Sequence, residues 1–497
     1  MVAKTPIEVL IADFLKSKGY TKTLTTFQNE AGITLPSTDG YFESLQEIVD
    51  DRQKYLEHST QVSQGLKNLA IDDHELLSLI KPWQYTNVAH HAPLSFSGAS
   101  LGLDLTIIDD LKIGGDSAPS KQCLLVSGND KILRIVDITD YSTLAISDPI
   151  DSGSIFKSFV AIPGTSYVMS GAMDGLVYFF KVSDDDHKSP KKLQLIKKHK
   201  IHRRVILKIN YLPIDDHSGY LASIGFDSSL NVIKLSIDHG SIEIKDISRI
   251  YTLSNPTDLY CFNYKASFTK SPIPLFLISR TDSTLLSFFT LDSHGLKIVE
   301  VSRVSLNDAE FSSYQFTPVN LSVYNPSSDA HTIDQQSIDE DVTKTPLISI
   351  ATSHQPYLRI ITTKFPNLQV ELESIRNNSD GDDGDDAVVV SDNCNQELVG
   401  KTLRGMIISN VVTTVAQDKY SKHVIHWKTN GSGVWIAGDD GIIRGVNFSK
   451  NDYTEVAQLK SHDGEFGARI ICLAGTTKGG KEILFSSSSD KQIFVWQ

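Results

Sequence analysis

A single unit recurs seven times along this chain and constrains its fold more than any other feature. Each copy has an apolar run, a few small residues, a tight turn that usually carries an acid, and a second run of β-branched or aromatic residues. Two such runs around a tight turn are typical of a β-hairpin. The copies cover residues 123–138, 167–182, 220–235, 275–291, 347–363, 434–448 and 483–497. The sequence therefore predicts a mostly β body made of seven hairpins.

The last copy carries further signature residues, namely His462, the serine run 486–489, Asp490 and Trp496. With them, the region 84–497 resembles the WD-repeat β-propellers. The early turn acids lie 44, 53 and 55 residues apart, at or above the period of about 40–45 for such repeats. The resemblance implies a seven-bladed WD-type β-propeller. It also implies a structural hydrogen-bond network inside the last blade, made of His462, Ser486, Asp490 and Trp496.

The other copies depart from the signature. They carry Val136, Phe180 or Lys234 in place of the tryptophan, and the fifth copy has His354-Gln355 where the acid belongs. The chain stops just after the third strand of the last copy, which leaves that blade without an outer strand. We expect Gln84–His90 to supply that strand, because closing the ring removes an unpaired edge.

The first 33 residues form a different pattern. Thr5, Pro6 and Glu8 are typical of a helix start, apolar residues then recur at helical spacing, and Lys18-Gly19 indicates a stop. A second helix is expected from Thr21. Residues 10–30 resemble the LisH motif, a helical hairpin that generally dimerises, and the resemblance implies a dimer contact through Leu10, Ile11, Phe14, Leu15, Tyr20, Leu24 and Phe27. The alternative is an amphipathic hairpin packed onto its own chain.

Residues 34–83 are expected to be a helical connector, with one amphipathic helix through Phe42 and Val49 and a weaker helical patch at 75–80. Two polar, acidic insertions, 325–344 and 374–399, interrupt the propeller pattern. We expect both to be solvated loops.

The composition of the chain argues against several classes of function. Acidic residues outnumber basic ones by 60 to 47, a net charge of −13, which argues against direct nucleic-acid binding. The four cysteines are widely separated, and no signal peptide or membrane-spanning run is evident. These features predict a soluble protein of the cytoplasm or nucleus that does not contact a membrane.

Three short segments resemble catalytic or ligand-binding motifs, but they lack the structural context that these motifs require. The Gly98–Gly102 segment matches a nucleophile elbow, but it is expected at the entry of a propeller strand. The Gly475–Lys481 segment begins like a phosphate-binding loop, yet Glu482 follows and the segment is expected to be a hairpin turn. The acidic run 380–386 has its glycine out of register for a calcium loop. We therefore predict no catalytic residue, no metal site and no cofactor.

One basic cluster stands out against the acidic background. It contains Lys197, Lys198, Lys200, Arg203 and Arg204, and we expect it in a loop on the upper propeller face. Such a reversal of sign suits an acidic or phosphorylated partner. A plain solvated loop is the alternative.

These observations together predict a non-catalytic dimeric scaffold that presents its propeller to protein partners. Proteins of similar build include dynein regulators, corepressor subunits and subunits of ubiquitin ligases. A propeller-fold enzyme with an active site in its central channel is the second hypothesis, because the fold alone does not decide function.

Overall fold

The computed structural model describes residues 7–33, 79–84, 102–114, 118–149, 154–184, 190–238, 241–307, 316–327, 329, 331–379, 401–448, 454–460 and 468–497. The chain divides into two units, Met1–Leu76 and Leu77–Gln497. The predicted helix through Phe42 and Val49, the strand donor beyond Gln84, the run 380–386 and His462 all lie outside the described residues.

The first unit contains the predicted helical hairpin, α1 (Ile7–Ser17) and α2 (Thr21–Ala31). Gly19 ends α1 in a left-handed conformation with φ 76°, and Gly32 ends α2 in the same way with φ 65°. The N–H of Tyr20 donates to the Leu15 carbonyl, which satisfies one of the free carbonyls at the end of α1. The predicted stop at Lys18-Gly19 is confirmed.

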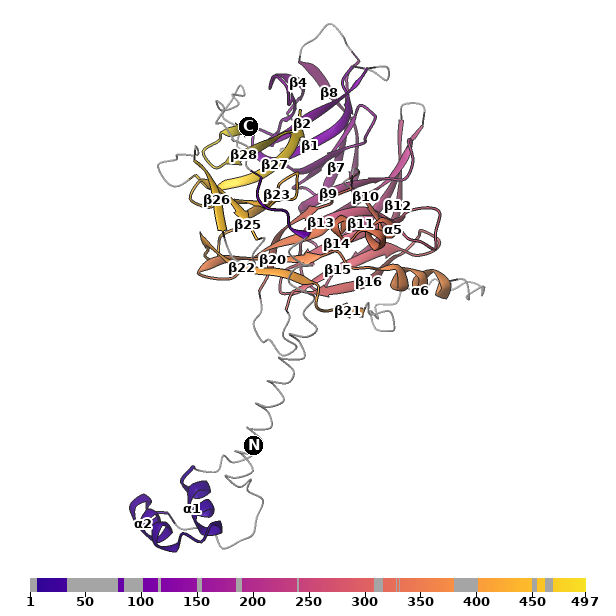
Figure 1. Cartoon of the computed structure of the whole chain (residues 1–497). Helices are drawn as coiled ribbons and strands as arrows, with labels where there is room; N and C mark the ends of the chain where they lie inside the picture. The colour runs from indigo at the N-terminus through magenta and orange to yellow at the C-terminus, as the bar shows by residue number, and fades with distance from the viewer. Residues whose placement is uncertain are drawn as a thin grey trace. The chain divides into compact units, whose positions relative to one another are not determined.

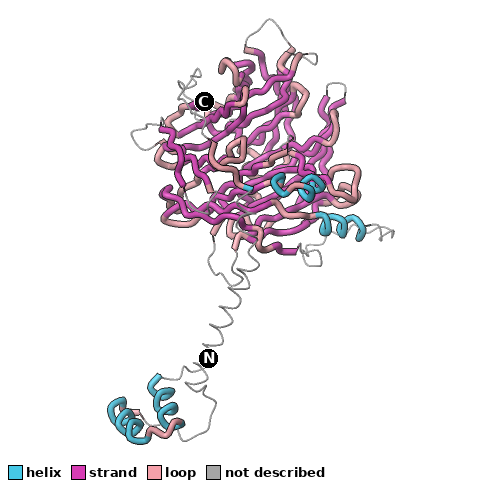
Figure 2. Tube along the Cα trace, viewed as in Figure 1, coloured by secondary structure: helices cyan, strands magenta, loops and turns pink. Residues whose placement is uncertain are grey.

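The second unit is a succession of antiparallel meanders (Figures 1 and 2). The first four are β1 (Gly102–Lys112), β2 (Ser120–Gly128), β3 (Leu133–Asp137) and β4 (Thr143–Ser147); β5 (Phe156–Ala161), β6 (Tyr167–Ala172), β7 (Leu176–Val182) and β8 (Lys191–Lys200); β9 (Ile206–Pro213), β10 (Ser218–Gly225), β11 (Ser229–Asp238) and β12 (Ser241–Tyr251); and β13 (Pro256–Lys265), β14 (Ile273–Arg280), β15 (Leu285–Leu291) and β16 (Ile298–Ser305).

The later meanders are β17 (Pro318–Tyr324), β19 (Leu347–Thr352), β20 (Tyr357–Lys364) and β22 (Ile407–Ala416); β23 (Val424–Trp427), β24 (Val434–Ala437), β25 (Ile442–Asn447) and β26 (Thr454–Lys460); and β27 (Ile470–Lys478), β28 (Lys481–Ser488) and β29 (Ile493–Trp496). Each predicted hairpin is the second and third strand of one meander, which is the central pair in the six four-stranded meanders. All seven hairpins are therefore confirmed.

The hairpin turns explain why an acid recurs in the sequence. The carboxylates of Asp130, Asp174, Asp440 and Asp490 each accept the backbone N–H two residues further on, at 2.9–3.2 Å. The residue between donor and acceptor adopts a positive φ in each case, from 65° at Lys131 to 78° at Gly175. A short acidic side chain at this position fixes the tight turn, and the turn sets the register of the two strands.

The meanders close into a circle. The first strand of each meander contacts the first strand of the next, in the order β1, β5, β9, β13, β17, β23, β27, and β27 contacts β1. Figure 1 shows the yellow strands β27 and β28 beside the violet β1, so the end of the chain lies against the start of the second unit. Of the predicted closing strand only Gln84 is described, and its side chain accepts a hydrogen bond from Asn430.

Apolar side chains fill the space between neighbouring meanders. Leu124, Val126 and Val136 pack against Ile483, Phe485 and Val495 of the last meander in a single cluster with little or no exposure. Comparable clusters join the second meander to the third and the third to the fourth. Burial of a side chain of this size stabilises the fold by about 1.5–3 kcal/mol, so each seam between sheets holds a large share of the stability.

The first strands share a second regularity, a β-bulge close to their start. The pairing of first and second strands skips one residue at Leu103, Lys157, Leu207, Thr257, Val319 and Ile471. A bulge re-aims the side chain that follows it. In these strands that following residue is polar or a cysteine.

We call the resulting set of side chains the inner belt; it comprises Asp104, Ser158, Lys208, Asp258, Asn320, His426 and Cys472. Each of these residues interacts with the next first strand around the circle. Ser158 Oγ accepts the Ile209 N–H at 3.2 Å, Asp258 Oδ2 accepts the Leu321 N–H at 2.8 Å and Asn320 Oδ1 accepts the Ile425 N–H at 2.9 Å. Asp104 accepts the Phe159 N–H, and the Cys472 thiol accepts the Leu105 N–H across the closing seam.

Two positions of the inner belt use other chemistry. The ammonium group of Lys208 cannot accept a hydrogen bond from a backbone N–H. It forms an ion pair with the Asp258 carboxylate and lies 4.2 Å from the centroid of the Tyr260 ring. His426, on the one first strand without a bulge, hydrogen-bonds the backbone of Gly475. Every seam between first strands therefore carries a side-chain interaction.

The two predicted insertions are more structured than expected, which corrects the solvated-loop prediction. Within 325–344, β18 (Thr332–Asp334) pairs in parallel with β13, followed by α5 (Gln335–Glu340) and the 3₁₀ helix η1 (Val342–Lys344). Ile333 is 1% exposed, and Gln335 accepts a 2.8 Å hydrogen bond from Tyr264. The few apolar residues in this polar segment thus anchor it to the fourth meander.

The second insertion begins inside a helix. Residues 374–379 are the end of α6 (Gln369–Ser379), which packs through Leu372 and Ile375 into the core of the fourth and fifth meanders. Beyond the gap, β21 (Lys401–Leu403) pairs in parallel with β16. Residues 380–399 lie outside the described part of the chain.

The inner belt predicts a large cost for removing Asp258. Its carboxylate accepts the Leu259 and Leu321 N–H groups and pairs with Lys208, and the residue is 2% exposed. Asp258→Ala leaves these donors without an acceptor, so we expect the free energy of unfolding, measured by urea denaturation, to fall by about 3 kcal/mol.

The matched control is Asp216→Ala, the same substitution at an exposed position between β9 and β10. Surface substitutions of this kind change stability little, so we expect a change of less than about 0.5 kcal/mol in the free energy of unfolding. Equal effects of the two substitutions would contradict the role of the belt.

Candidate functional site

The five predicted partner-binding cations lie on β8 and the corner that follows it. Lys197, Lys198 and Lys200 belong to β8, and Arg203 and Arg204 lie between β8 and β9. The predicted loop is therefore wrong for the three lysines. They form a strand because the run pairs with the apolar strand β7 along its length, while long charged side chains are readily accommodated on an outer strand.

The three predicted partner-binding lysines on β8 contact neutral groups. Lys197 Nζ donates to the Ile242 carbonyl of β12 at 3.3 Å, and Lys200 Nζ donates to the Asp174 carbonyl. Lys198 Nζ lies 5.2 Å from the centroid of the Tyr178 ring. Among the residues that the structure describes, none of the five cations forms an ion pair with a carboxylate, so this strand keeps its positive charge on a chain of net charge −13.

A buried histidine network lies directly after β8. His202 is 1% exposed, and its ring nitrogens lie 2.8 Å from Asp227 Oδ1 and 2.9 Å from Ser223 Oγ. Burial lowers the pKa of His202, against the pull of Asp227. Although burial opposes its charge, the Arg203 N–H, His202 and Ser229 together hold the pKa of Asp227 below its usual value.

This network was not predicted from the sequence, which singled out only the neighbouring cations. The signal was available: His202 precedes the turn acid Asp227 by 25 residues, close to the 28 residues between His462 and Asp490. The network locks the corner between the second and third meanders, since its histidine comes from that corner and its serine and acid from β10 and the following turn. It thereby fixes the end of β8.

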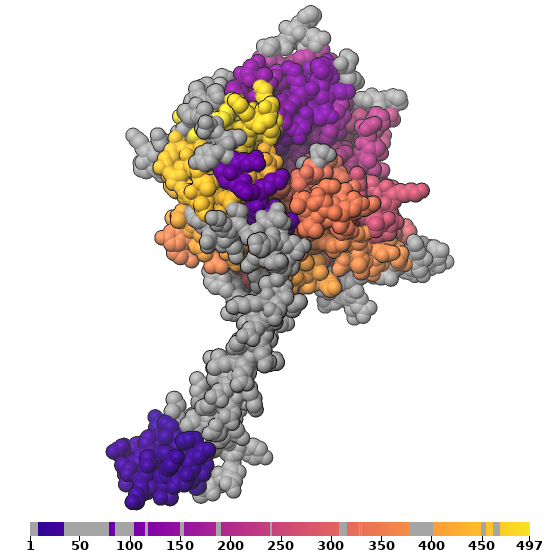
Figure 3. Space-filling model, viewed as in Figure 1, coloured from indigo at the N-terminus to yellow at the C-terminus, as the bar shows by residue number. Residues whose placement is uncertain are grey.

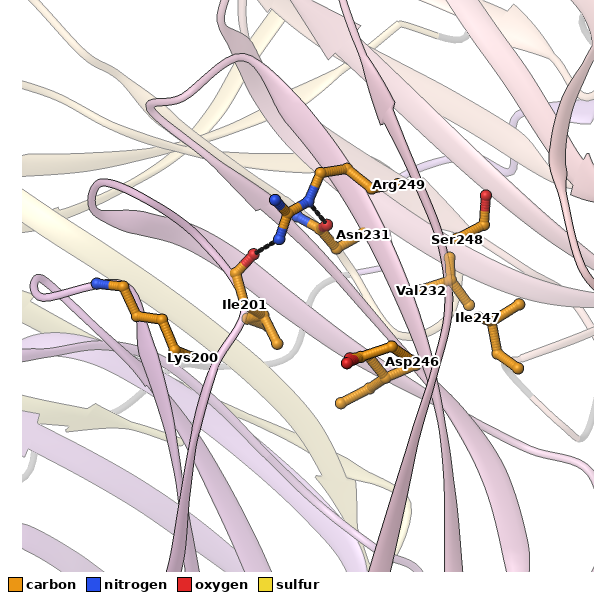
Figure 4. Close-up of a pocket in the computed structure, with 9 residues that line it drawn as sticks. Lys200, Ile201, Asn231, Val232, Asp246, Ile247, Ser248 and Arg249 are labelled. Carbon is orange, nitrogen blue, oxygen red and sulfur yellow. Dashed lines mark hydrogen bonds between the residues drawn. The ribbon is translucent and has the colours of Figure 1, made fainter. Parts of the chain in front are cut away.

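A pocket of about 320 Å³ opens beside this corner, between the end of β8 and strands β11 and β12. Figure 4 shows Arg249 reaching from β12 toward Ile201, whose carbonyl accepts a 2.5 Å hydrogen bond from the guanidinium group. The same guanidinium group also donates to Asn231. Lys200, Asp246 and Ser248 complete the polar part of the lining, so the pocket offers both donors and acceptors.

In the inner belt, Asp104 has an unusual titration. Burial raises the pKa of its carboxyl group to about 7, against the pull of Lys208 and then Lys157. The carboxylate accepts the N–H groups of Leu105 at 3.1 Å and of Phe159. Asp104 is therefore a titratable group near neutral pH that is held in place by two neighbouring first strands.

A tryptophan anchors the start of the second unit. The ring of Trp83 lies 5.2 Å, centroid to centroid, from that of Trp435, and Lys428 Nζ lies 4.4 Å from the Trp83 centroid. Lys428 forms a 2.5 Å ion pair with Glu482, both nearly unexposed. A Cβ atom at Gly433 or Gly445 would come within 2.7 Å of the Trp83 ring, so glycine is required there for close approach. In Figure 3 the violet segment 79–84 lies against the yellow C-terminal meanders.

The predicted network of the last hairpin is partly visible. Trp496 Nε1 donates to Ser486 Oγ at 2.9 Å, and Trp496 is 2% exposed. The Asp490 carboxylate accepts the Gln492 N–H in the hairpin turn. The contribution of His462 lies outside the described residues.

In the head, the predicted dimer residues line one side of the two helices. Leu10, Ile11, Phe14, Leu15, Leu24 and Phe27 are half-buried, and Tyr20 is 56% exposed. No residue of α2 is buried. A single copy of the described helices thus leaves much of its apolar face uncovered.

Other features bear on ligands and membranes. Within the described ranges, no three His, Cys, Asp or Glu side chains are placed to hold a metal ion together. The Gly475–Lys481 segment lies in the predicted hairpin: it is the end of β27, a two-residue turn at Gly479 and Gly480 with positive φ at both, and the first residue of β28. No helix among these residues combines the length and the apolar character needed to cross a bilayer.

Comparison with known protein families identifies both parts of the chain. A LisH domain matches residues 5–39 and a β-propeller domain matches residues 72–497, both described for the UCP007778 family. The chain belongs to the UCP007778 family. The predicted LisH head and β-propeller body are thereby confirmed as a combination.

A relative with the same extent is found in yeast. The chain is 24% identical over 485 residues to an uncharacterized protein of Saccharomyces cerevisiae, YGR117C. The alignment covers 94% of this chain and 92% of the yeast protein. The alignment therefore spans both domains of this chain, whereas the name of the yeast protein supplies no activity.

The raised pKa of Asp104 predicts that the stability of the propeller depends on pH. An aspartate titrates near 3.9 in an unfolded chain and here near 7, so the folded protein binds more protons between these values. The free energy of unfolding should therefore fall as pH rises from about 4 to about 7. Asp104→Asn has no carboxyl group to titrate, so its free energy of unfolding should not fall in this way. Because Asp104 is partly exposed, we expect the difference in free energy of unfolding between the variant and wild type to rise by about 1–2 kcal/mol from pH 5 to pH 8.

Urea denaturation of both proteins at the two pH values measures this difference. Asp109→Asn, a substitution in the same strand at a residue that contacts Gln122, serves as the control and should show a constant difference from wild type. A difference between Asp104→Asn and wild type that does not change with pH would contradict the raised pKa.

Proposed function

We propose that this protein is a non-catalytic dimeric scaffold whose LisH domains join two copies and whose propellers bind protein partners in a multi-protein complex. In this proposal each of the seven meanders is one blade of a WD-type propeller. The combination of the two family domains on one chain supports a role in protein interaction. The partners are proteins, and neither nucleic acid nor membrane is bound directly.

The observation that carries the proposal is the uncovered apolar side of the head. Two helices of 11 residues each are short for independent stability and gain it by packing an apolar face. Leu24 and Phe27 of α2 remain half-exposed in a single copy. A second copy offers the same apolar face and covers both with a symmetric contact.

The proposed location is the cytoplasm or the nucleus. Cys123, Cys261 and Cys472 are free thiols, and the first two are buried. Burial raises the pKa of Cys123 to about 12, which keeps the thiol protonated and unreactive. These properties suit a reducing compartment.

An active site in the central channel is the second candidate function. It is favoured by Asp104, because a pKa of about 7 suits a general base at neutral pH. The same carboxylate, however, accepts the backbone N–H groups of Leu105 in its own strand and of Phe159 in the neighbouring first strand. Its structural use therefore favours the scaffold over the enzyme.

Dimerisation through the head is tested by one substitution in the full chain. Leu24→Asp places a charge on the apolar side of α2, so we expect sedimentation equilibrium to give half the mass of the wild-type dimer. Thr23→Asp adds the same charge on the adjacent exposed side and should leave the dimer intact. Thermal melting should be the same for both variants, because the propeller is a separate unit. A wild-type protein that is monomeric, or a Leu24→Asp variant that stays dimeric, would overturn the proposal.

A further inference from the structure

One edge of the second meander is open. β8 pairs with β7 from Leu193 to Lys200, but on its other side it pairs with β4 only over Lys191–Leu193. β4 ends at Ser147, and Pro149 follows, which lacks the N–H needed to continue a ladder. Among the described residues, nothing pairs with the free side of residues 194–200. Backbone donors and acceptors on such an edge are available to another strand.

The open edge carries positive charge on both of its faces. Lys197 and His199 point toward β12, since they contact Ile242 and Asp246. Lys198 and Lys200 lie on the opposite face, where they contact Tyr178 and Asp174. Side chains of an added strand also alternate between the two faces. Acidic residues at successive positions of that strand would therefore meet a lysine on either side.

The middle of the edge is apolar. Leu195 and Ile196 are 42% and 45% exposed, and the register between β7 and β8 skips Ile196. Lysines alone on an edge strand are a common protection against unwanted pairing. Two exposed aliphatic residues between the lysines act against such protection, since they add apolar contact area for an incoming strand.

The pocket of about 320 Å³ extends this surface toward β12. Lys200 and Ile201 form its wall on the side of β8, and Arg249 forms part of the opposite wall (Figure 4). His202 and its network hold this corner in place. The edge is thus presented by a rigid support, which lowers the entropy cost of binding.

We propose that the open edge of β8 binds an extended acidic segment of a partner protein, which adds to the sheet as a further antiparallel or parallel strand. The inference rests on the proposed scaffold function and names the partner chemistry. Charge complementarity decides the occupant, because five cations without a described carboxylate partner stand on a chain of net charge −13. A protein segment is favoured over nucleic acid, because the edge offers ladder hydrogen bonds and the nearby Tyr178 ring is buried beneath Lys198.

The test uses full-length protein and a fluorescein-labelled peptide of 12 residues that contains only glutamate and valine, with glutamates on both faces. Fluorescence anisotropy gives its dissociation constant for wild type and for Lys197→Ser/Lys198→Ser/Lys200→Ser. Three cross-strand charge pairs are lost, so we expect affinity to fall by about ten-fold. The matched control, Lys270→Ser/Lys297→Ser/Lys419→Ser, removes three exposed lysines from elsewhere on the propeller and should change affinity by less than about two-fold.

Two further probes separate strand addition from simple charge attraction. The same peptide with alternate backbone nitrogens methylated keeps its charge but cannot complete a ladder, and it should bind about ten-fold more weakly. A single-stranded DNA of 12 nucleotides should fail to displace the parent peptide. The proposal is overturned if the methylated peptide binds equally well, if both triple variants lose affinity equally, or if the DNA displaces the peptide.

The outcome is independent of the head. Leu24→Asp should bind the peptide with the wild-type dissociation constant, since β8 belongs to the propeller unit. Failure of peptide binding with an intact dimer rejects the edge site alone. Peptide binding by a protein that proves monomeric rejects the dimeric scaffold alone.

Discussion

The circle of meanders depends on the way each first strand satisfies its backbone groups. A first strand has its second strand on one side only, so the N–H groups that face the next meander have no ladder partner. The inner belt supplies acceptors for them, as Asp258 does for Leu321 and Asn320 does for Ile425. Since an unpaired buried N–H costs free energy, the polar side chains behind the bulges are a condition of closure. The Cys472 thiol beside the Leu105 N–H extends this arrangement across the seam between the last and first meanders.

This dependence explains what could be predicted from the sequence. The seven hairpins were recognisable because a turn acid and two short apolar runs act locally, within about 16 residues. The inner belt was not, because each of its members finds its partner in another meander, about 50–105 residues away in the chain for Ser158, Asp258 and Asn320. A polar residue such as Asn320, three positions into a strand, carries no local sign of that partner.

The predictions for the residues of β8 and for the two insertions were wrong for related reasons. A run rich in lysine has low strand propensity, and only its pairing with the apolar strand β7 makes it a strand. The segment 325–344 is polar on average, yet the buried Ile333 packs into the core where β18 pairs with β13. The buried network of His202 was not predicted, because its partners Ser223 and Asp227 lie more than 20 residues further along the chain. In each case a contact distant in sequence outweighed the local composition.

The same division between inner and outer strands bears on function. On the inner side, Lys208 and Asp258 form an ion pair with each other, and Asp258 also accepts a backbone N–H. Both side chains therefore stabilise the fold. On the outer side, Lys197, Lys198 and Lys200 of β8 contact only carbonyls and a ring, and their charge remains available. A weak strand addition at one such edge gains strength when two edges are joined, because the second contact becomes intramolecular. The proposed LisH dimer carries two copies of β8, and a partner with two acidic segments would engage both without any tighter contact at either one.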